Sequence, residues 1–329
     1  MKSFLQSASW AQFQKDLGRQ VFQTEGPDFS YLAILERNAV GPYLYCPYGP
    51  VGTDREALNS ALESLQELAA DQGARFIRVE PVSATNGATV ESVSASLWRA
   101  GCLPAPRDIQ PSRTWLVDLR PLEDELLAAM KSTNRNLHRN IRKKGVSFST
   151  SNDPADIEIL LRFLHQTAER SKFKPQEDTY LRTAAQALMP SGDATLYVAN
   201  LNDAPIGAAL AFDSADTRTY AHAALDSTHR KLSAGIPMVV RMILDAKAKG
   251  LTTFDMWGIA PENDPDHPWA GFSYFKKSFG GAAVEYPGTW DLPVNKPVYS
   301  AYTLARKAYQ QVGKIRSRIA TLQRSRTQS

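Results

Sequence analysis

The residue in this sequence best suited to chemistry is Lys276. Three aromatic side chains stand close to it along the chain, namely Tyr274, Phe275 and Phe279. An ammonium group among aromatic rings is partly desolvated, so it interacts strongly with negative charge that develops on a reacting oxygen. The alternative is a lysine on a helix surface, whose aliphatic stem covers its aromatic neighbours.

A covalent acyl-enzyme has no obvious nucleophile in this sequence. Cys46 follows apolar residues and precedes a proline, and we expect both it and Cys102 to pack in the core. The sequence contains no Gly-x-Ser-x-Gly elbow and no phosphate-binding P-loop. The two cysteines lack the spacing of metal ligands, and so do the histidines His165, His229 and His267. We therefore expect no metal and no bound cofactor.

Positive charge is concentrated in two stretches of the chain. Residues 131–144 contain six basic residues and no acid, and eight basic residues but no acid follow Asp291. Such clusters attract phosphate-rich partners such as RNA, anionic lipid or a pyrophosphate-linked sugar. The alternative is a solvated helix face and a frayed basic tail. In the first stretch four cations recur at spacings that fall along one face of a helix: Arg135, Arg139, Arg142 and Lys143.

Length and composition indicate a soluble protein with two domains. The 329 residues are enough for two cores of ordinary size, and the apolar and charged fractions, 43% and 22%, are those of a globular chain. No apolar run approaches the roughly 18 residues that a membrane span needs. Polar residues interrupt the N-terminal region where a signal peptide would be apolar. We therefore expect a cytoplasmic protein.

The order of the expected elements indicates two related α/β domains. From residue 146 onward we expect a strand, two helices, three strands, a helix and a strand, at 146–150, 155–170, 178–188, 195–200, 206–212, 218–223, 236–249 and 253–257. That order is typical of the GNAT acyltransferase fold, a layered α/β domain with a splayed sheet. The first half shows the pattern less clearly, with elements expected at 9–17, 31–36, 43–46, from about 54, at 76–79, through Leu97 and at 115–119.

Eight short stretches, spread in order over nearly the whole chain, carry a family resemblance. They are 4–10 (Phe-Leu-Gln-Ser-Ala-Ser-Trp), 45–51 (Tyr-Cys-Pro-Tyr-Gly-Pro-Val), 78–81 (Arg-Val-Glu-Pro), 99–102, 110–119, the basic stretch 134–146, 254–259 (Phe-Asp-Met-Trp-Gly-Ile) and 274–281 (Tyr-Phe-Lys-Lys-Ser-Phe-Gly-Gly). Each alone occurs by chance in many chains. Together and in this order they resemble the FemA/FemB/FemX (FemABX) family of peptidoglycan-bridge aminoacyltransferases.

The resemblance implies two tandem GNAT-like domains, with the C-terminal segment completing the first. We expect residues 1–115 plus 290–329 to form the precursor-binding domain, and residues 116–289 to form the domain that binds tRNA and the acyl donor. Some longer family members insert a helical coiled-coil arm. The absence of a sustained heptad pattern here indicates a short member without that arm.

The implied reaction is aminolysis of an ester. An amine on the stem peptide of a peptidoglycan precursor attacks the carbonyl that joins an amino acid to the terminal ribose of aminoacyl-tRNA. Ester to amide is downhill, so no ATP is needed. Glu80, at the end of a strand, is the acid best placed to accept a proton from the amine. The alternatives are that Glu80 is only a hydrogen-bond acceptor at the strand end, and that a phosphate of the substrate takes the proton.

The resemblance also implies contacts to the sugar nucleotide of the precursor. These fall on Gln14 and Asp16, on Lys174 and Tyr180, and on His222. Lys174 and Tyr180 suit a phosphate and the edge of a sugar or uridine, respectively. Gln14 and Asp16 depart from the lysine and asparagine expected there, and His222 replaces a tyrosine, so it could donate a hydrogen bond or simply pack.

On the donor side, the resemblance implies that Lys276 contacts the acceptor end of tRNA or the developing charge. It also implies that the basic stretch holds tRNA phosphates through Arg135, Arg139, Arg142 and Lys143. Trp257 stands where family members often carry glycine, so it narrows the donor pocket.

Two other functions stay open. An N-acyltransferase that uses acyl-CoA would need a pyrophosphate loop at 230–235, where Ser233 replaces the first glycine and hinders close backbone approach. A non-catalytic protein that binds RNA or a membrane surface would use the basic clusters but leave the stretch around Lys276 without a task. The sequence leaves open the donated amino acid, the choice between UDP-MurNAc-pentapeptide and lipid II, peripheral contact with the inner membrane surface, and the oligomeric state.

Overall fold

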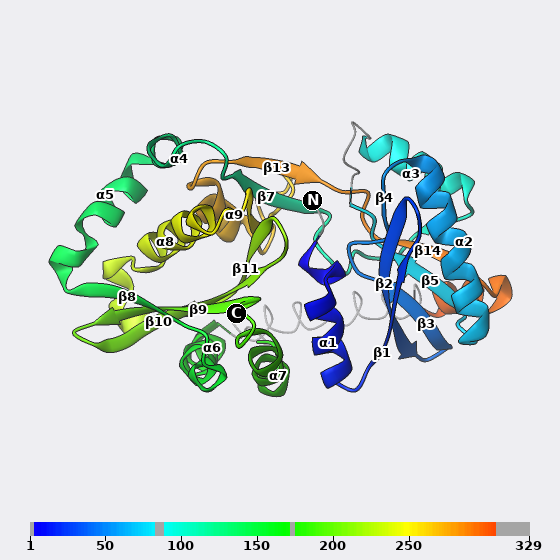
Figure 1. Cartoon of the computed structure of the whole chain (residues 1–329), viewed down its shortest axis with the longest axis horizontal. Helices are drawn as coiled ribbons and strands as arrows, with labels where there is room; N and C mark the ends of the chain where they lie inside the picture. Colours follow the sequence, from blue (N-terminus) through cyan, green and yellow to red (C-terminus); the bar gives the residue numbers. More distant parts are fainter. Residues whose placement is uncertain (1–2, 83–88, 172–174, 307–329) are drawn as a thin grey trace, which may run out of the picture.

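The computed structural model of the 329-residue chain describes residues 3–82, 89–171 and 175–306. Two seven-stranded sheets lie beside each other, each covered by helices (Figure 1). The layered α/β class that the sequence predicts is therefore confirmed. Within the described residues, no helix has the length and apolar character required to cross a membrane.

The first sheet is built mainly from the N-terminal third of the chain. Its strands run in the order β1-β2-β3-β5-β14-β6, with β4 paired to β2. Their bounds are β1 (Gln20–Glu25), β2 (Phe29–Asn38), β3 (Gly41–Cys46), β4 (Val51–Gly52), β5 (Phe76–Val79), β6 (Leu103–Pro104) and β14 (Trp290–Pro293). The helical elements of this part are η1 (Phe4–Gln6), α1 (Ala8–Asp16), α2 (Arg55–Asp71) and α3 (Val90–Arg99).

The second sheet has the order β13-β7-β12-β11-β10-β9-β8. Its strands are β7 (Arg113–Asp118), β8 (Val146–Ser151), β9 (Ala194–Leu201), β10 (Ala204–Asp213), β11 (Thr217–Leu225), β12 (Thr253–Gly258) and β13 (Ala282–Glu285). The helical elements around it are α4 (Glu123–Ala129), α5 (Ser132–Asn140), η2 (Ile141–Lys144), η3 (Pro154–Asp156), α6 (Ile157–Ser171), α7 (Asp178–Leu188), η4 (Ser227–Leu232), α8 (Gly235–Ala248) and α9 (Ala270–Lys277).

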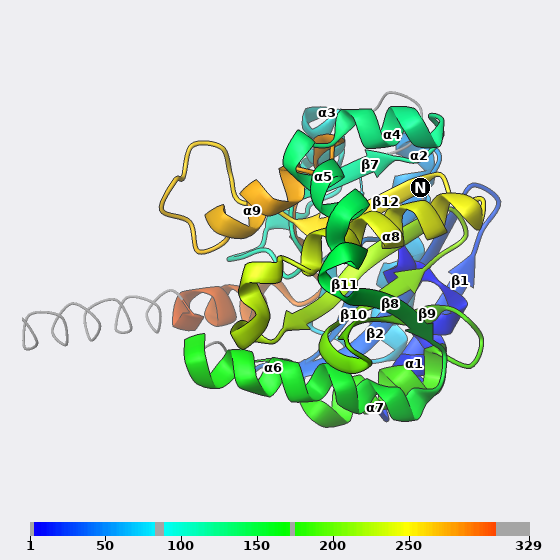
Figure 2. The same cartoon turned by 90° about the vertical axis from the view of Figure 1, so that its left-hand side faces the viewer.

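Alternation along the strands explains why the second sheet is covered on both faces. Leu196 and Val198 of β9 belong to a core cluster with α6 and α7, whereas Tyr197 and Ala199 belong to another cluster with α8. Successive side chains of a strand point to opposite faces. Figure 2 shows α6 and α7 on one side of this sheet and α8 on the other.

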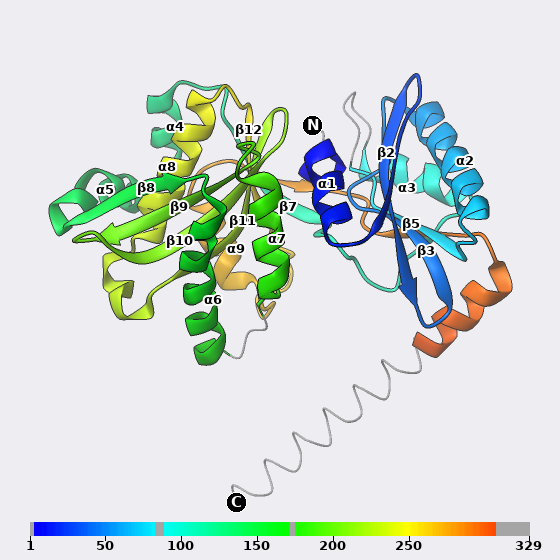
Figure 3. The ribbon, with the colours of Figure 1, turned by 60° about the horizontal axis from the view of Figure 1, so that its bottom comes forward.

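The two sheets are joined by the N-terminal segment. Phe4, Trp10 and Phe13 share one buried cluster with residues of α6, α7, β9 and β10, and with Leu32 and Ile34 of β2. Figures 1 and 3 both place α1 beside α7, between the two sheets. An element near the start of the chain therefore packs against both halves of the molecule.

A late segment of the chain completes the first sheet. β14 pairs antiparallel with both β5 and β6. The sequence did not indicate this strand. The expected boundary between residues 115 and 116 falls inside β7, all of which pairs in the second sheet. We propose that the first domain ends before residue 113 and resumes at β14.

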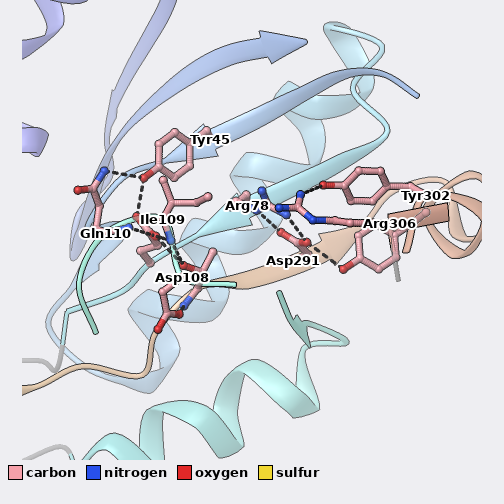
Figure 4. Close-up of polar contacts among 11 residues, drawn as sticks. Tyr45, Arg78, Asp108, Ile109, Gln110, Asp291, Tyr302 and Arg306 are labelled. Atoms are coloured by element: carbon pink, nitrogen blue, oxygen red, sulfur yellow. Dashed lines mark hydrogen bonds and ion pairs between the residues drawn. The ribbon is translucent and has the colours of Figure 1, made fainter. Parts of the chain in front are cut away.

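A buried ion pair holds β14 in place. The Arg78 guanidinium donates two hydrogen bonds of 2.7 Å to the Asp291 carboxylate, which also accepts one of 2.9 Å from the Tyr299 hydroxyl (Figure 4). Both charged side chains are at most 5% exposed. Because the pair is satisfied on both sides, removal of one partner leaves an uncompensated charge in the core.

Replacing Asp291 by asparagine should lower the free energy of unfolding by about 3 kcal/mol, because Arg78 would lose its ionic partner in the core. Urea unfolding followed by circular dichroism measures this loss. Asp118→Asn is the matched control, since Asp118 pairs with Arg120 at the surface and such pairs contribute little. Equal unfolding midpoints for the two variants would contradict the assignment.

Candidate active site

A cavity of about 390 Å³ lies between the two sheets. We call it the central cavity. It receives side chains from η1, α1, β2, β3, α7, β10, β11 and β12. Its wall includes several aromatic side chains, among them Trp10, Tyr45, Tyr180, Phe212, His222 and Trp257. A concave, largely apolar site with a few polar groups at the junction of two lobes is the usual form of a small-molecule site.

Three of the predicted precursor-binding residues meet in this cavity. Gln14 comes from α1, Tyr180 from α7 and His222 from β11, and all three line the wall. The three elements are far apart in the sequence, so only the packing of α1 against the second sheet brings these side chains together.

Two side chains of the cavity wall carry buried hydrogen-bond donors that no described residue satisfies. Gln14 is fully buried; its Oε1 accepts a 2.7 Å bond from Arg19 Nη1, while its Nε2 has no partner among the described residues. The indole Nε1 of Trp10 is likewise buried without a partner there. Because buried donors are almost always paired, these two groups are exceptions among the side chains of this wall.

Tyr180 and His222 in the wall are neutral near pH 7. Burial raises the pKa of Tyr180 to about 12, against an opposing effect of Arg19. Burial lowers the pKa of His222 to about 4. A charged group that acts on Tyr180 is Arg19, which is exposed at the rim and pairs with Glu36 at 3.2 Å. The wall therefore suits a neutral polar group, and the rim suits an anionic one.

Two of the predicted precursor contacts are not part of this wall. Asp16 is exposed and accepts a hydrogen bond from Gln12, one turn earlier on α1, so the helix directs it away from the central cavity. Lys174 lies outside the described residues.

Sequence reasoning missed Arg19. Gly18 adopts φ 78° at the end of α1, a backbone conformation that glycine takes without strain, and the chain then folds back so that the Arg19 amide donates to the Gln14 carbonyl. A glycine directly after a helix and before an arginine was the available signal.

Lys276 lies on α9 beneath the end of β12. Its Nζ donates to the Gly258 carbonyl at 2.5 Å, and burial lowers its pKa to about 8, against the opposing charge of Asp255. The burial of this lysine agrees with the expectation that it is partly desolvated, and the flanking aromatic rings differ in their surroundings. Tyr274 is 69% exposed with Lys131 Nζ 3.8 Å from its ring centre, and Phe279 faces the core. The end of β12 therefore supplies much of the polar environment of Lys276.

The turn at the end of β12 connects Lys276 with the central cavity. Trp257 lines the cavity and packs edge-to-face on Tyr48, with ring centres 5.5 Å apart. The next residue, Gly258, carries the carbonyl that accepts from Lys276. Lys276 does not line the cavity itself. It is connected to the cavity through two successive residues of this turn, since Trp257 lines the cavity and Gly258 binds Lys276.

Glu80 is buried behind the cavity wall. Its carboxylate accepts hydrogen bonds from the Tyr45 hydroxyl at 2.7 Å, the Gln110 amide at 2.8 Å and the Thr289 hydroxyl at 2.6 Å (Figure 4 shows Tyr45 and Gln110). It also accepts a 3.2 Å bond from the Ile109 amide. These contacts favour the interpretation of Glu80 as a strand-end acceptor that supports Tyr45 and Gln110. Its role as a proton acceptor stays a prediction.

The basic stretch is not one continuous helix. α5 ends at Asn140 and a 3-10 turn, η2, continues to Lys144, so its cations do not share a single α-helical face. Arg135 is half-buried and donates to the carbonyls of Ala128 and Met130, at the end of α4. The side chains of Arg139, Arg142 and Lys143 are exposed.

Two other expectations concern cysteine and the 230–235 loop. Cys46 and Cys102 are buried, and burial raises the pKa of Cys102 to about 12, so neither is an activated thiolate. Ser233 adopts φ 52° just before α8. A side chain therefore occupies a position at which a glycine would let a pyrophosphate approach the backbone.

Comparison with known proteins identifies relatives of this chain. The model of the Acetyltransferase (GNAT) domain family matches residues 128–269. Lipid II:glycine glycyltransferase of Staphylococcus epidermidis is 22% identical, over 87% of this chain and 82% of that protein. Aminoacyltransferase FemA of Staphylococcus aureus is 28% identical over a shorter segment, 34% of this chain and 26% of FemA.

Solved structures show the same arrangement of two lobes. The crystal structure of FemX superposes with a TM-score of 0.81 and 21% identity, over 91% of this chain and 94% of FemX. The structure of L-PGS from Bacillus licheniformis has a TM-score of 0.58 and 12% identity, over 87% of each chain. The fold is therefore that of paired GNAT-like domains. In sequence and in fold, the chain is thus similar to proteins of the FemABX family.

Proposed function

We propose that this protein is an aminoacyltransferase that moves an amino acid from aminoacyl-tRNA to the stem-peptide amine of a peptidoglycan precursor, either UDP-MurNAc-pentapeptide or lipid II. The product is an amide that begins or extends a cell-wall bridge. The names of its relatives, a lipid II:glycine glycyltransferase and FemA, support this class of reaction.

The observation that carries the proposal is the central cavity with its unsatisfied donors. Gln14 Nε2 and Trp10 Nε1 have no hydrogen-bond partner among the described residues. The aromatic side chains of the wall offer flat surfaces for sugar or base rings. Arg19 at the rim provides charge for a phosphate. A sugar nucleotide or a lipid-linked sugar has this combination of neutral rings and an anionic linkage.

In the proposed mechanism Lys276 stabilises the oxyanion. The precursor amine attacks the ester carbonyl, and negative charge develops on the carbonyl oxygen. The amine then loses a proton, the bond from the carbonyl carbon to the ribose oxygen breaks, and that oxygen takes up a proton and leaves as the ribose hydroxyl. A protonated Lys276, held by Gly258 and little exposed to water, acts strongly on that charge because it is already in position. We place the two substrates on either side of Trp257. Holding them close together lowers the activation free energy further.

The proposed tRNA contacts are those of the basic stretch. Arg139, Arg142 and Lys143 are exposed and suited to backbone phosphates. Arg135 is committed to the end of α4, so we assign it the role of orienting α5 beside the RNA. Without a coiled-coil arm, these contacts reach the acceptor stem.

Single-turnover transfer from a mixture of radiolabelled aminoacyl-tRNAs to UDP-MurNAc-pentapeptide and to lipid II tests the proposal. We expect label in one acceptor, and a rate at least about 100-fold lower for Lys276→Met because one oxyanion donor is lost. Lys277→Met is the matched control, since this neighbour packs over Trp115. Transfer from acetyl-CoA alone, or RNA binding without any transfer, would replace the proposal by one of its two alternatives.

The rate should also decline as the pH rises through about 8, where Lys276 loses its proton. Burial lowers this pKa below its ordinary value, so the required cation is present below pH 8 and absent above it. Lys276→Arg should remove the decline, because arginine stays protonated. Each rate is corrected for spontaneous ester hydrolysis. A wild-type rate that keeps rising to pH 9.5 would count against a cationic role.

Gln14→Glu tests the precursor side separately. It keeps an oxygen for Arg19 but replaces the free donor by an acceptor, which repels a ligand oxygen. We expect the KM for the precursor to rise about tenfold, as for a lost hydrogen bond in a buried site, while the KM for aminoacyl-tRNA stays constant. Gln12→Glu, exposed on the same helix, is the control. A rise in the KM for both substrates would show general damage instead.

A further inference from the structure

The strand that leads to Lys276's partner is interrupted by a bulge. In the pairing of β12 with β7, Asp255 faces Leu116 but Gly258 faces Thr114. Three steps along β12 thus correspond to two along β7, so β12 carries one extra residue. Bulges of this kind bend a strand and redirect its side chains, and they are frequent next to active sites. We call residues 255–258 the β12 bulge.

The backbone of the β12 bulge is strained at Trp257. This residue has φ 67°, in the left-handed region that is strained for residues other than glycine. The adjacent Gly258 is closely packed, because a Cβ there would lie 2.7 Å from Pro111 and 2.9 Å from Trp269. Surrounding contacts must therefore hold this conformation.

The Asp255 carboxylate supplies such a contact. Its Oδ1 accepts a 2.7 Å bond from the Trp257 amide, inside the bulge, and a 2.5 Å bond from the Thr114 hydroxyl on β7. One oxygen thus ties the displaced residue of β12 to the partner strand. Asp255 is 6% exposed and Thr114 is fully buried, so water does not compete for these bonds.

We propose that Asp255 is a positioning residue of this site: its carboxylate pins the β12 bulge, and thereby directs Trp257 into the central cavity and the Gly258 carbonyl onto Lys276. The negative charge of the same carboxylate also favours the protonated form of Lys276. Asp255 thus couples the wall of the precursor cavity to the charge on the donor side. The inference rests on the proposed function for what Lys276 does, but not for the geometry that Asp255 maintains.

The charged and titratable groups around Asp255 are Lys276 and two tyrosines. Burial raises the pKa of Asp255, opposed by its two hydrogen bonds and by Lys276. Burial, with the charge of Asp255, raises the pKa of Tyr48 and of Tyr286 as well. Both phenols stay neutral, which leaves Lys276 as the cation that balances this carboxylate.

A double-mutant cycle tests the pinning. Asp255→Ala, which removes both hydrogen bonds, Trp257→Gly and the double variant are compared with the wild type by urea unfolding. Glycine takes the left-handed conformation without strain, so we expect Asp255→Ala to lower the urea midpoint about half as much when residue 257 is glycine. An equal effect of Asp255→Ala in both backgrounds would overturn the proposal.

The electrostatic part is tested by the reactivity of Lys276 toward acetic anhydride between pH 6 and 11, measured by mass spectrometry. The midpoint should lie near 8 in the wild type and fall by about one unit in Asp255→Asn, since a nearby carboxylate favours the cation. Thr114→Val removes a hydrogen bond but keeps the charge, so its midpoint should follow the wild type. An unchanged midpoint in Asp255→Asn, or a wild-type midpoint typical of an exposed lysine, would overturn the coupling.

Activity separates this inference from the proposed function. In a transfer assay, Asp255→Asn should lower kcat and should change the KM for aminoacyl-tRNA little. The pH at which kcat declines on the alkaline side should fall by about one pH unit, as the reactivity midpoint of Lys276 does. If the wild type transfers no amino acid while both activity-independent results hold, the proposed function fails and the role of Asp255 stands. If transfer occurs but the double-mutant cycle shows no coupling, the proposed function stands and the role of Asp255 fails.

Discussion

The packing of the N-terminal segment between the two sheets is the interaction on which the rest of the structure depends. Phe4 stacks on Phe212 of the second sheet with ring centres 4.8 Å apart, and Phe13 packs edge-on against Tyr180 of α7. Buried aromatic pairs of this size are among the strongest apolar contacts in proteins. Because they join elements of both halves, they fix the width of the cavity between them.

A buried glutamine attaches this segment to the first sheet. Gln6 is 3% exposed, accepts a 2.7 Å bond from the Leu32 amide and donates to the Pro47 carbonyl at 2.6 Å. The Gln6 side-chain amide therefore connects η1 to β2 and to the turn after β3, and among the described residues the backbone of η1 pairs with neither. The cavity wall thus rests on polar contacts on one side and aromatic packing on the other.

Charge is distributed unevenly around the site, which suits a reaction between two large substrates. The cavity wall has neutral phenol and imidazole groups, and two of its other side chains carry donors without a partner among the described residues. The cations lie at the rim, on the basic stretch and at Lys276. A buried cation without a partner is costly. Lys276 avoids that cost through the Gly258 carbonyl and the opposing Asp255 charge, and it keeps a pKa low enough to respond near neutral pH.

The sequence by itself determined most of the elements and the class of fold, because helix caps, glycine stops and apolar periodicity act over a few residues. The helix starting near residue 54 is an example: Asp54 caps it and Leu58, Leu62 and Leu65 form its buried face. The motifs also predicted Lys276, Gln14, Tyr180 and His222 as site residues. The convergence of the last three on one cavity was decided only by the tertiary structure, since α1, α7 and β11 meet through long-range packing. The same holds for β14, for Arg19 and for the β12 bulge, whose contacts link residues distant in the chain or depend on a backbone turn that no local pattern specifies.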